Sequence, residues 1–199
     1  MSEITAAMVK ELRDRTGVGM MECRNALKET NGDVDAAIKY LRERGITKAE
    51  SRASRATKEG LIHSYIHFNN KVGVLLEINC ETDFVARTDQ FKALAEEICL
   101  QIAATNPLAV SADAIDPAIL DKEREIAHNK AVLDGKKPEF MDKIVEGHIR
   151  KFCAENALLD QELISQEKRT VKDLITDAIT STGENIQIAR FARFALGEE

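Results

Sequence analysis

The sequence lacks the long apolar runs that would place it in a membrane. No run approaches the roughly eighteen apolar residues that a membrane-spanning helix needs. The opening residues, MSEITAAMVK, contain neither the apolar block of a signal peptide nor the Arg- and Ser-rich composition of a transit peptide. We therefore expect no membrane partner and a cytoplasmic location.

Paired cysteines are also missing. The four cysteines, Cys23, Cys80, Cys99 and Cys153, lie far apart, and no two form a CxxC pair. Isolated cysteines of this kind behave as small apolar side chains. We expect buried free thiols in a reducing compartment.

Basic residues are in the minority. The net charge is -6, with 31% of residues charged, whereas a nucleic-acid-binding domain normally carries a basic excess or a strong basic patch. The balance predicts a chain without a direct nucleic-acid partner.

The motifs of nucleotide and cofactor chemistry are absent. Neither GxxxxGKS nor GxxxxGKT occurs, and the two glycines of TGVGM do not extend to GxGxxG. No GxSxG is present either. Most carboxylates alternate with Lys and Arg on predicted helices, which is typical of a solvated face. We expect no cofactor and no catalytic residue, although catalytic groups need not be close in sequence, so an enzyme stays an alternative.

The histidines do not form a metal site at this spacing. His63 and His67 fall on a predicted strand, where four residues span about 13 Å, so the two side chains cannot share one ion. His128 and His148 fall in predicted helices without a ligand partner four residues on. We expect no metal.

Residues 1–45 carry the pattern of three short helices. Gly17 and Gly19 interrupt the first periodic run, and Asn31 to Asp33 form a turn with helix-capping chemistry before the third. Gly45 stands where a C-terminal cap belongs. Three helices this short bury only a small core, which is more typical of a docking domain than of an enzyme. Residues 46–59, with almost no large apolar side chain, are predicted to be a linker, either irregular or partly helical.

From residue 60 the period changes from 3.6 to 2. Ile62, Ile66 and Phe68 share one face of a predicted strand, and residues 69–71 form a hairpin turn to a second strand over 72–80. Helices follow over about 89–105, 117–133, 138–156 and 170–183, with short extended segments at 108–110 and 158–164. The chain closes with a strand, ENIQIARFARFAL, in which Ile186, Ile188, Phe194 and Leu196 share a parity. The fold class is α+β: a three-helix domain, then a core over 60–199 in which helices pack against an antiparallel sheet.

The stretch NCETDFVART, residues 79–88, connects the second strand to a helix but places an aromatic residue at its centre. Phe84 either packs under the hairpin as core or is held out for a partner to bury. Asp83 either caps the following turn or contacts that partner. Thr88 is positioned as the N-cap of the next helix.

Several blocks, in order and over nearly the whole chain, closely resemble bacterial elongation factor Ts. They are ITAAMVKELRDRTGVGMMECRNAL, NGDVDAAIKYLRERG, GVLLEINCETDFVARTDQF, KIVEGHIRKF and GENIQIARFARF. The resemblance implies a ubiquitin-associated-like domain over 1–45 and a core that binds elongation factor Tu. A single hairpin block and a single GENI block resemble the family's short form, which implies a homodimer through the core.

The resemblance also implies a function and a set of site residues. The implied function is guanine-nucleotide exchange: the factor binds elongation factor Tu with GDP, disturbs its Mg²⁺ site and lets GTP replace GDP. Thr82, Asp83, Phe84 and Val85 match the motif that acts at the Mg²⁺ region. In the N-terminal domain, the contact residues implied are Arg13, Met20 and Met21, although Met20 equally fits a place between the short helices.

Two other functions remain open from the residues alone. A scaffold that binds ubiquitin-like partners would use only residues 1–45. An RNA-associated factor would act through the basic linker and lose affinity steeply with salt.

Overall fold

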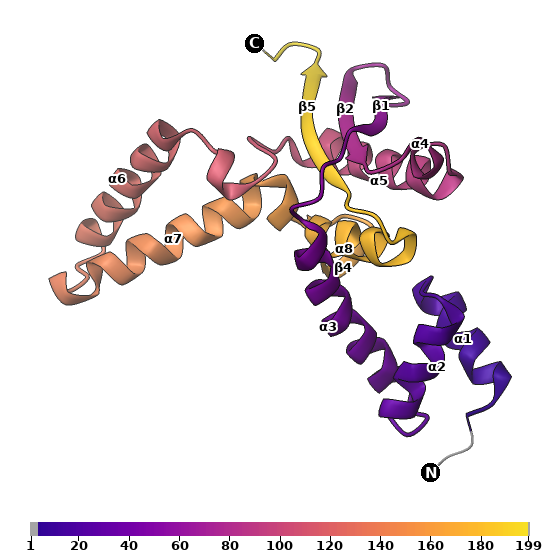
Figure 1. The fold of residues 1–199 in the computed structure, drawn as a ribbon. Helices are drawn as coiled ribbons and strands as arrows, with labels where there is room; N and C mark the ends of the chain where they lie inside the picture. The colour runs from indigo at the N-terminus through magenta and orange to yellow at the C-terminus, as the bar shows by residue number, and fades with distance from the viewer. Residues whose placement is uncertain (1–3, 199) are drawn as a thin grey trace. The chain divides into compact units, whose positions relative to one another are not determined.

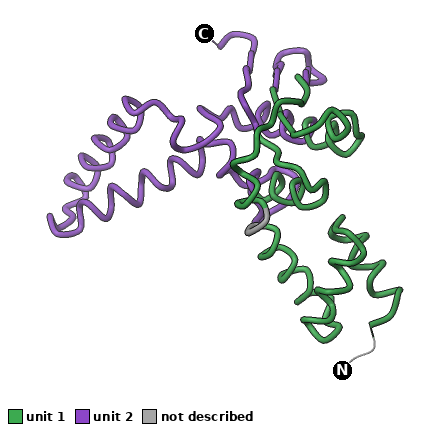
Figure 2. The backbone as a smooth tube through the Cα atoms, in the orientation of Figure 1, with its two compact units in different colours: residues 1–62, 77–95, 173–187 green, residues 63–76, 96–172, 188–199 purple. Residues whose placement is uncertain are grey.

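The computed structural model describes residues 4–198, apart from the side chains of residues 46–48 (Figure 1). Within this range the chain forms two compact units (Figure 2). Unit 1 comprises the described part of 1–62 with 77–95 and 173–187, and unit 2 comprises 63–76, 96–172 and the described part of 188–199.

Unit 1 begins with three helices around a small core. They are α1 (Ala6–Thr16), α2 (Met20–Glu29) and α3 (Val34–Arg52). Thr5 and Asp33 cap α1 and α3 through their side-chain oxygens, and the cap at Asp33 is the one that the turn chemistry predicts. The core consists of side chains from all three helices and from the loop after α1: Val9, Leu12, Val18, Cys23, Ala26, Leu27, Ala37 and Leu41.

The predicted end of the third helix at Gly45 is wrong, because α3 continues to Arg52. Gly45 is buried inside the helix and faces α8 (Val171–Thr182). A Cβ atom there would lie 2.9 Å from Oγ1 of Thr180, so the glycine permits a close helix approach. The first half of the predicted linker is therefore helical.

Three strands form the main sheet, in the order β1-β2-β5. They are β1 (Glu59–Ile66), β2 (Val72–Cys80) and β5 (Gln187–Ala195). The predicted hairpin turn is confirmed: Asn70 adopts φ 56°, and the amide of His67 donates to the carbonyl of Val72 at 2.9 Å. Asn tolerates the left-handed conformation that such a turn requires.

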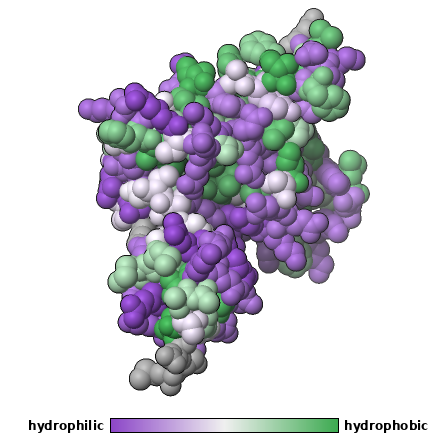
Figure 3. Space-filling view, turned by 90° about the vertical axis from the view of Figure 1, so that its right-hand side faces the viewer, coloured by the Kyte–Doolittle hydropathy of each residue, from purple (hydrophilic) through white to green (hydrophobic). Residues whose placement is uncertain are grey.

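One face of the hairpin is buried and the other is open. Val74, Leu76, Ile78 and Cys80 of β2 are buried. The opposite face exposes apolar side chains, including Ile62, Ile66, Phe68 and Leu75. In the space-filling view apolar side chains reach the surface at several places among hydrophilic ones (Figure 3).

The closing strand differs from its predicted pattern. Its even-numbered apolar residues do not share one environment: Ile186 and Ile188 are buried, whereas Phe194 and Leu196 are exposed. The alternation changes phase after Ile188, where two exposed residues follow each other. A shift of one residue moves every later side chain to the other face.

Helices account for most of unit 2. The second half of α5 (Asp89–Thr105) lies here, with η1 (Ala112–Ala114), α6 (Pro117–Leu133), η2 (Pro138–Phe140) and α7 (Met141–Asn156). Asp116 caps α6 and Pro117 is its first residue, as predicted. The helices α6 and α7 lie side by side as a hairpin (Figure 1).

Two predicted extended segments are only partly correct. The segment 108–110 contributes a single bridge, between Ala109 and Ala157. The segment 158–164 begins as a 3-10 turn, η3 (Leu158–Asp160), before β3 (Glu162–Leu163), which pairs antiparallel with the unpredicted β4 (Gln166–Thr170). Gln101 fixes this region, because its buried amide donates to the Glu162 carbonyl at 3.1 Å and accepts from the Ile164 amide at 3.0 Å.

The mixture of helices and antiparallel sheets confirms the α+β class. The ubiquitin-associated-like character of the first domain and the domain boundaries stay predictions. Cys23, Cys80 and Cys99 are buried free thiols, as expected, and Cys153 is partly buried. Among residues 4–198, no helix is long and apolar enough to cross a bilayer.

Candidate functional site

The stretch after β2 forms a one-turn helix, α4 (Asp83–Ala86), where the sequence suggests only a loop. Thr82 is its N-cap: its backbone is extended, and its Oγ1 accepts a hydrogen bond from the Val85 amide at 3.5 Å. Threonine suits this position because its hydroxyl satisfies an amide that has no partner inside the helix. The cap sets the direction in which the next three side chains leave the backbone.

Phe84 leaves the turn toward solvent. Its side chain is 79% exposed, whereas Ala86, two residues on, is buried. Val85 is partly buried. The turn is thus fixed to the protein by its later residues while the aromatic ring is presented outward. Phe84 is not part of the core in this structure.

Asp83 is the first residue of α4 and forms an ion pair with Arg87 one turn later. Its Oδ2 lies 2.9 Å from Nη2 of Arg87. A carboxylate at a helix N-terminus is favourable, but an exposed pair such as this contributes little stability. Because Thr82 supplies the cap of α4, the Asp83 carboxylate is not needed for that role and lies partly exposed in its pair with Arg87.

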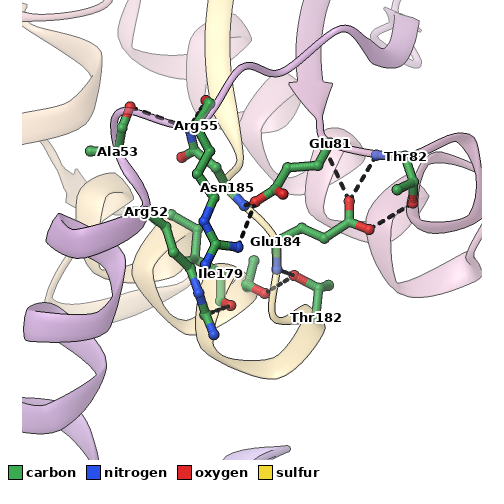
Figure 4. Close-up of polar contacts among 10 residues, drawn as sticks. Arg52, Ala53, Arg55, Glu81, Thr82, Ile179, Thr182, Glu184 and Asn185 are labelled. Atoms are coloured by element: carbon green, nitrogen blue, oxygen red, sulfur yellow. Dashed lines mark hydrogen bonds and ion pairs between the residues drawn. The ribbon is translucent and has the colours of Figure 1, made fainter.

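The turn is held from a distant part of the chain by Glu184 (Figure 4). Oε2 of Glu184 accepts hydrogen bonds from the amides of Glu81 and Thr82, at 3.1 and 3.0 Å. Its Oε1 accepts a third, from the hydroxyl of Thr82 at 2.6 Å. One carboxylate therefore satisfies three donors on two consecutive residues.

A second set of contacts ties the same region to the segment after α3 (Figure 4). Oε1 of Glu81 accepts from the amide of Asn185 at 2.6 Å and lies 3.3 Å from Nη1 of Arg55. These hydrogen bonds, the one from the Asn185 amide above all, lower the pKa of the Glu81 carboxyl, so it is ionised at neutral pH. The side-chain amide of Asn185, a buried residue, donates from Nδ2 to the carbonyls of Arg55 and Ala53, at 2.9 and 3.4 Å.

The thiol of Cys80 forms a hydrogen bond to the backbone of the turn. Its Sγ donates to the carbonyl of Thr82 at 3.1 Å. Burial, followed by the nearby Glu184 carboxylate, raises the pKa of the Cys80 thiol. A neutral, buried thiol is a poor nucleophile, so Cys80 acts here as a packing and hydrogen-bonding group.

Thr88 caps α5, as the sequence predicts. Its Oγ1 accepts from the amide of Phe91 at 3.2 Å and donates to the carbonyl of Val85 at 2.8 Å. We expect Thr88→Ala to lower the free energy of unfolding by about 1 kcal/mol, the usual cost of a lost N-cap. Urea denaturation measures the change, and Thr88→Ser, which keeps the hydroxyl, is the matched control. A Thr88→Ala protein as stable as wild type would show that the cap contributes nothing.

The N-terminal candidate residues lie on the surface of the three-helix core. Gly17 ends α1 in the left-handed conformation at φ 68°, and buried Val18 anchors the loop that leads into α2. Met20 and Met21 follow at the start of α2 and are 46% and 67% exposed. Arg13, on α1, is also exposed. Met20 therefore does not pack between the helices.

Each of three histidines pairs with a neighbouring side chain. Nε2 of His63 lies 2.6 Å from Glu96, and Nδ1 of His67 lies 2.7 Å from the hydroxyl of Tyr65. His148 lies 3.0 Å from Glu123. In the part of the chain that the structure describes, no three His, Cys, Asp or Glu side chains are grouped to hold a metal ion.

A capped turn that presents an aromatic ring to solvent offers apolar area without an enclosing pocket, which is typical of surfaces that bind another protein. The family model described as elongation factor TS matches residues 2–198. The chain therefore belongs to the elongation factor Ts family, whose members are translation elongation factors.

Named relatives match along almost their whole length. The chain is 53% identical to elongation factor Ts of Thermoanaerobacter sp. (strain X514) over 195 residues, 98% of this chain and 96% of that protein. It is 50% identical to the protein of the same name from Oleidesulfovibrio alaskensis over 197 residues, 99% of this chain and all of that protein. The identity to the Solidesulfovibrio magneticus protein is 51% over 199 residues, covering both chains completely.

Proposed function

We propose that this protein is a guanine-nucleotide exchange factor for elongation factor Tu. It binds the GDP-bound form and promotes GDP release by disturbing the Mg²⁺ site, which allows GTP to bind. The observation that carries the proposal is the exposed ring of Phe84 on a turn that is capped by Thr82 and fixed by hydrogen bonds to Glu184. Membership of the elongation factor Ts family supports it.

Exchange of this kind needs no catalytic group on the factor. A GTPase holds GDP through its P-loop and through a Mg²⁺ ion that neutralises phosphate charge. A factor that binds the nucleotide-free state more tightly must weaken GDP by the same ratio, because the two equilibria are linked. The factor therefore has only to present the right surface, and we propose no cofactor, no metal and no catalytic residue for this chain.

The four residues of the turn have separate parts in this proposal. Phe84 is the apolar group that enters the partner near its Mg²⁺ ion. Val85, the partly buried residue that follows Phe84, extends the apolar surface. The carboxylate of Asp83, one residue before Phe84, contacts polar groups of the partner in this proposal. Thr82 holds the backbone of the turn through its cap.

The N-terminal domain supplies a second contact in the proposal. Arg13, Met20 and Met21 place a cation and two exposed thioethers on the three-helix core, which we propose has a ubiquitin-associated-like fold. Methionine suits a binding surface because its flexible side chain adapts to the partner. This contact adds affinity, while the turn at Phe84 acts on the nucleotide.

A double substitution tests the methionine surface. We expect Met20→Ser with Met21→Ser to raise the Kd for elongation factor Tu about tenfold, because each apolar side chain loses part of the 1.5–3 kcal/mol that full burial gives. The maximal rate of GDP release at saturating factor should change little. Leu133→Ser, at an exposed apolar residue of α6, is the control. An unchanged Kd, measured by calorimetry, would remove these residues from the interface.

We also propose a homodimer through the core, a cytoplasmic location, and no direct nucleic-acid partner. The support for the dimer is the exposed apolar face of the sheet, which a second copy of the chain could cover.

Release of labelled GDP from elongation factor Tu, with and without this protein, tests the proposal. We expect release to accelerate with the concentration of the factor and then to saturate. Unchanged release would contradict it. Binding that survives loss of residues 79–88 would favour a scaffold of the N-terminal domain, and binding to RNA that weakens steeply with salt would favour an RNA-associated factor.

A further inference from the structure

We propose that Glu184 is the positioning residue of the site: its carboxylate fixes the Thr82 turn and so sets where Phe84 points. The proposal rests on the proposed exchange function, because it explains how the ring is held ready for the partner. Glu184 follows Gly183 at the end of α8 and is more than a hundred residues from the turn in sequence, so no local pattern connects the two.

Glu184 accepts hydrogen bonds from donors that the end of β2 leaves without a strand partner. Strand β2 ends at Cys80, so the amides of Glu81 and Thr82 lie beyond it. Unpaired backbone donors away from water are costly, and the Glu184 carboxylate accepts from both. Hydrogen bonds to a charged acceptor are roughly twice as strong as neutral ones. The chain is thereby fixed immediately before α4.

The same carboxylate also contacts Thr82, the N-cap of α4. The hydroxyl of Thr82 donates to Glu184 at 2.6 Å and accepts from the amide of Val85 at 3.5 Å. Donating to Glu184 holds the hydroxyl in one rotamer and leaves its lone pairs directed toward Val85. Because Phe84 lies between these two residues, the same contacts define its backbone.

Glu184 is itself held in place by its neighbours. Gly183 ends α8 with φ 81°, a conformation that favours glycine. The amide of Glu184 donates to Oγ1 of Thr182 at 3.3 Å, and the next residue, Asn185, is 1% exposed. Asn185 in turn donates its amide to the side chain of Glu81. The two segments thus exchange hydrogen bonds in both directions, as Figure 4 shows.

Holding the turn in advance matters because an exposed ring on a mobile loop would have to be ordered when it binds. Ordering costs free energy at the moment of association, and the apparent affinity falls with the fraction of molecules in the competent conformation. Phe84 is exposed, so the core of the protein does not hold its ring, and the hydrogen bonds that Glu184 accepts fix the backbone on the N-terminal side of the turn.

Three substitutions separate the geometry of Glu184 from its charge. Glu184→Ala removes every acceptor. Glu184→Asp keeps the charge but withdraws it by one methylene, so it cannot reach all three donors. Glu184→Gln keeps the length and one oxygen for the two amides, and its NH₂ group can donate to the hydroxyl of Thr82. The proposal predicts that Gln rescues function while Asp does not.

The experiment measures stimulated GDP release from elongation factor Tu for these variants of the full chain. We expect Glu184→Ala and Glu184→Asp to lose about tenfold, through a reduced fraction of competent turn, and Glu184→Gln to stay within about threefold of wild type. Glu125→Ala, at an exposed glutamate of α6, should leave release unchanged. Hydrogen exchange should speed up at the amides of residues 81 and 82 in the Ala variant.

The double variant Glu184→Ala with Phe84→Ala distinguishes positioning from any other role. If Glu184 acts through Phe84, the double variant releases GDP no more slowly than Phe84→Ala alone. A further loss in the double variant would overturn the proposal. It would also be overturned if Glu184→Ala released GDP at the wild-type rate while Phe84→Ala was impaired. If Glu184→Ala does not fold, comparing GDP release by Glu184→Asp with release by Glu184→Gln tests the same proposal. Normal release by Phe84→Ala would instead overturn the proposed function.

Discussion

Phe84→Ala should abolish most of the stimulated release of GDP from elongation factor Tu while leaving the factor itself as stable as before. We expect release to fall about ten- to a hundredfold, the equilibrium equivalent of the 1.5–3 kcal/mol gained when one such side chain is buried. The free energy of unfolding should change by less than about 0.5 kcal/mol, as is usual for a surface substitution. Both effects follow from a ring that is 79% exposed in the free protein.

The chain contains a matched control seven residues later. Phe91 of α5 is 1% exposed and packs in the core. Phe91→Ala should therefore cost about 3–5 kcal/mol of stability through the cavity it leaves, and any loss of exchange should follow the unfolded fraction. If Phe84→Ala were destabilised as much as Phe91→Ala, while its folded molecules released GDP at the wild-type rate, Phe84 would be a core residue.

The second large effect concerns the sheet. The protein should be a dimer at micromolar concentration, and Phe194→Ser should make it a monomer. Ile66, Leu75, Phe194 and Leu196 line a shallow groove of about 570 Å³ on the exposed face of unit 2. An apolar face of this kind on an edge strand favours association or aggregation unless it is covered. A second copy would cover it with the same face.

The size of the effect follows from symmetry. In a two-fold interface each substitution removes two copies of the side chain, so Phe194→Ser forfeits about 3–6 kcal/mol, more than a hundredfold in the dissociation constant. Molar mass by light scattering measures it directly. Leu133→Ser, at a residue 87% exposed on α6, should leave the dimer intact. A wild-type protein that is monomeric and folded at micromolar concentration would contradict the proposed dimer.

Features with a local cause could be predicted from the sequence. The turn at Asn70, the cap at Asp116 with Pro117, and the cap of α5 at Thr88 all depend on the conformational and hydrogen-bonding preferences of one or two residues. Each is present where its pattern places it. The same reasoning accounts for the buried side of β2, whose alternation sets one face inward.

Features with a long-range cause could not be predicted in this way. Gly45 has the sequence context of a helix end, but its role is to let α8 approach, which depends on Thr180. Glu184 follows a helix as an ordinary polar residue, and only the fold brings it to Thr82. The block GENI marks the right segment through family resemblance, without revealing that its glutamate holds the turn. The phase change after Ile188 likewise depends on pairing and burial, not on local propensity.

The proposed action of Phe84 on the Mg²⁺ ion of elongation factor Tu can be tested by removing the ion. GDP release should be followed with wild-type factor and with Phe84→Ala, first in excess Mg²⁺ and then after the ion has been chelated. If the ring disturbs the Mg²⁺ site as proposed, removal of the ion should bring the two rates together. We predict a difference of ten- to a hundredfold with Mg²⁺, about the value of one buried Phe, and near equality without it. An equally large difference after chelation would show that Phe84 acts elsewhere on the partner.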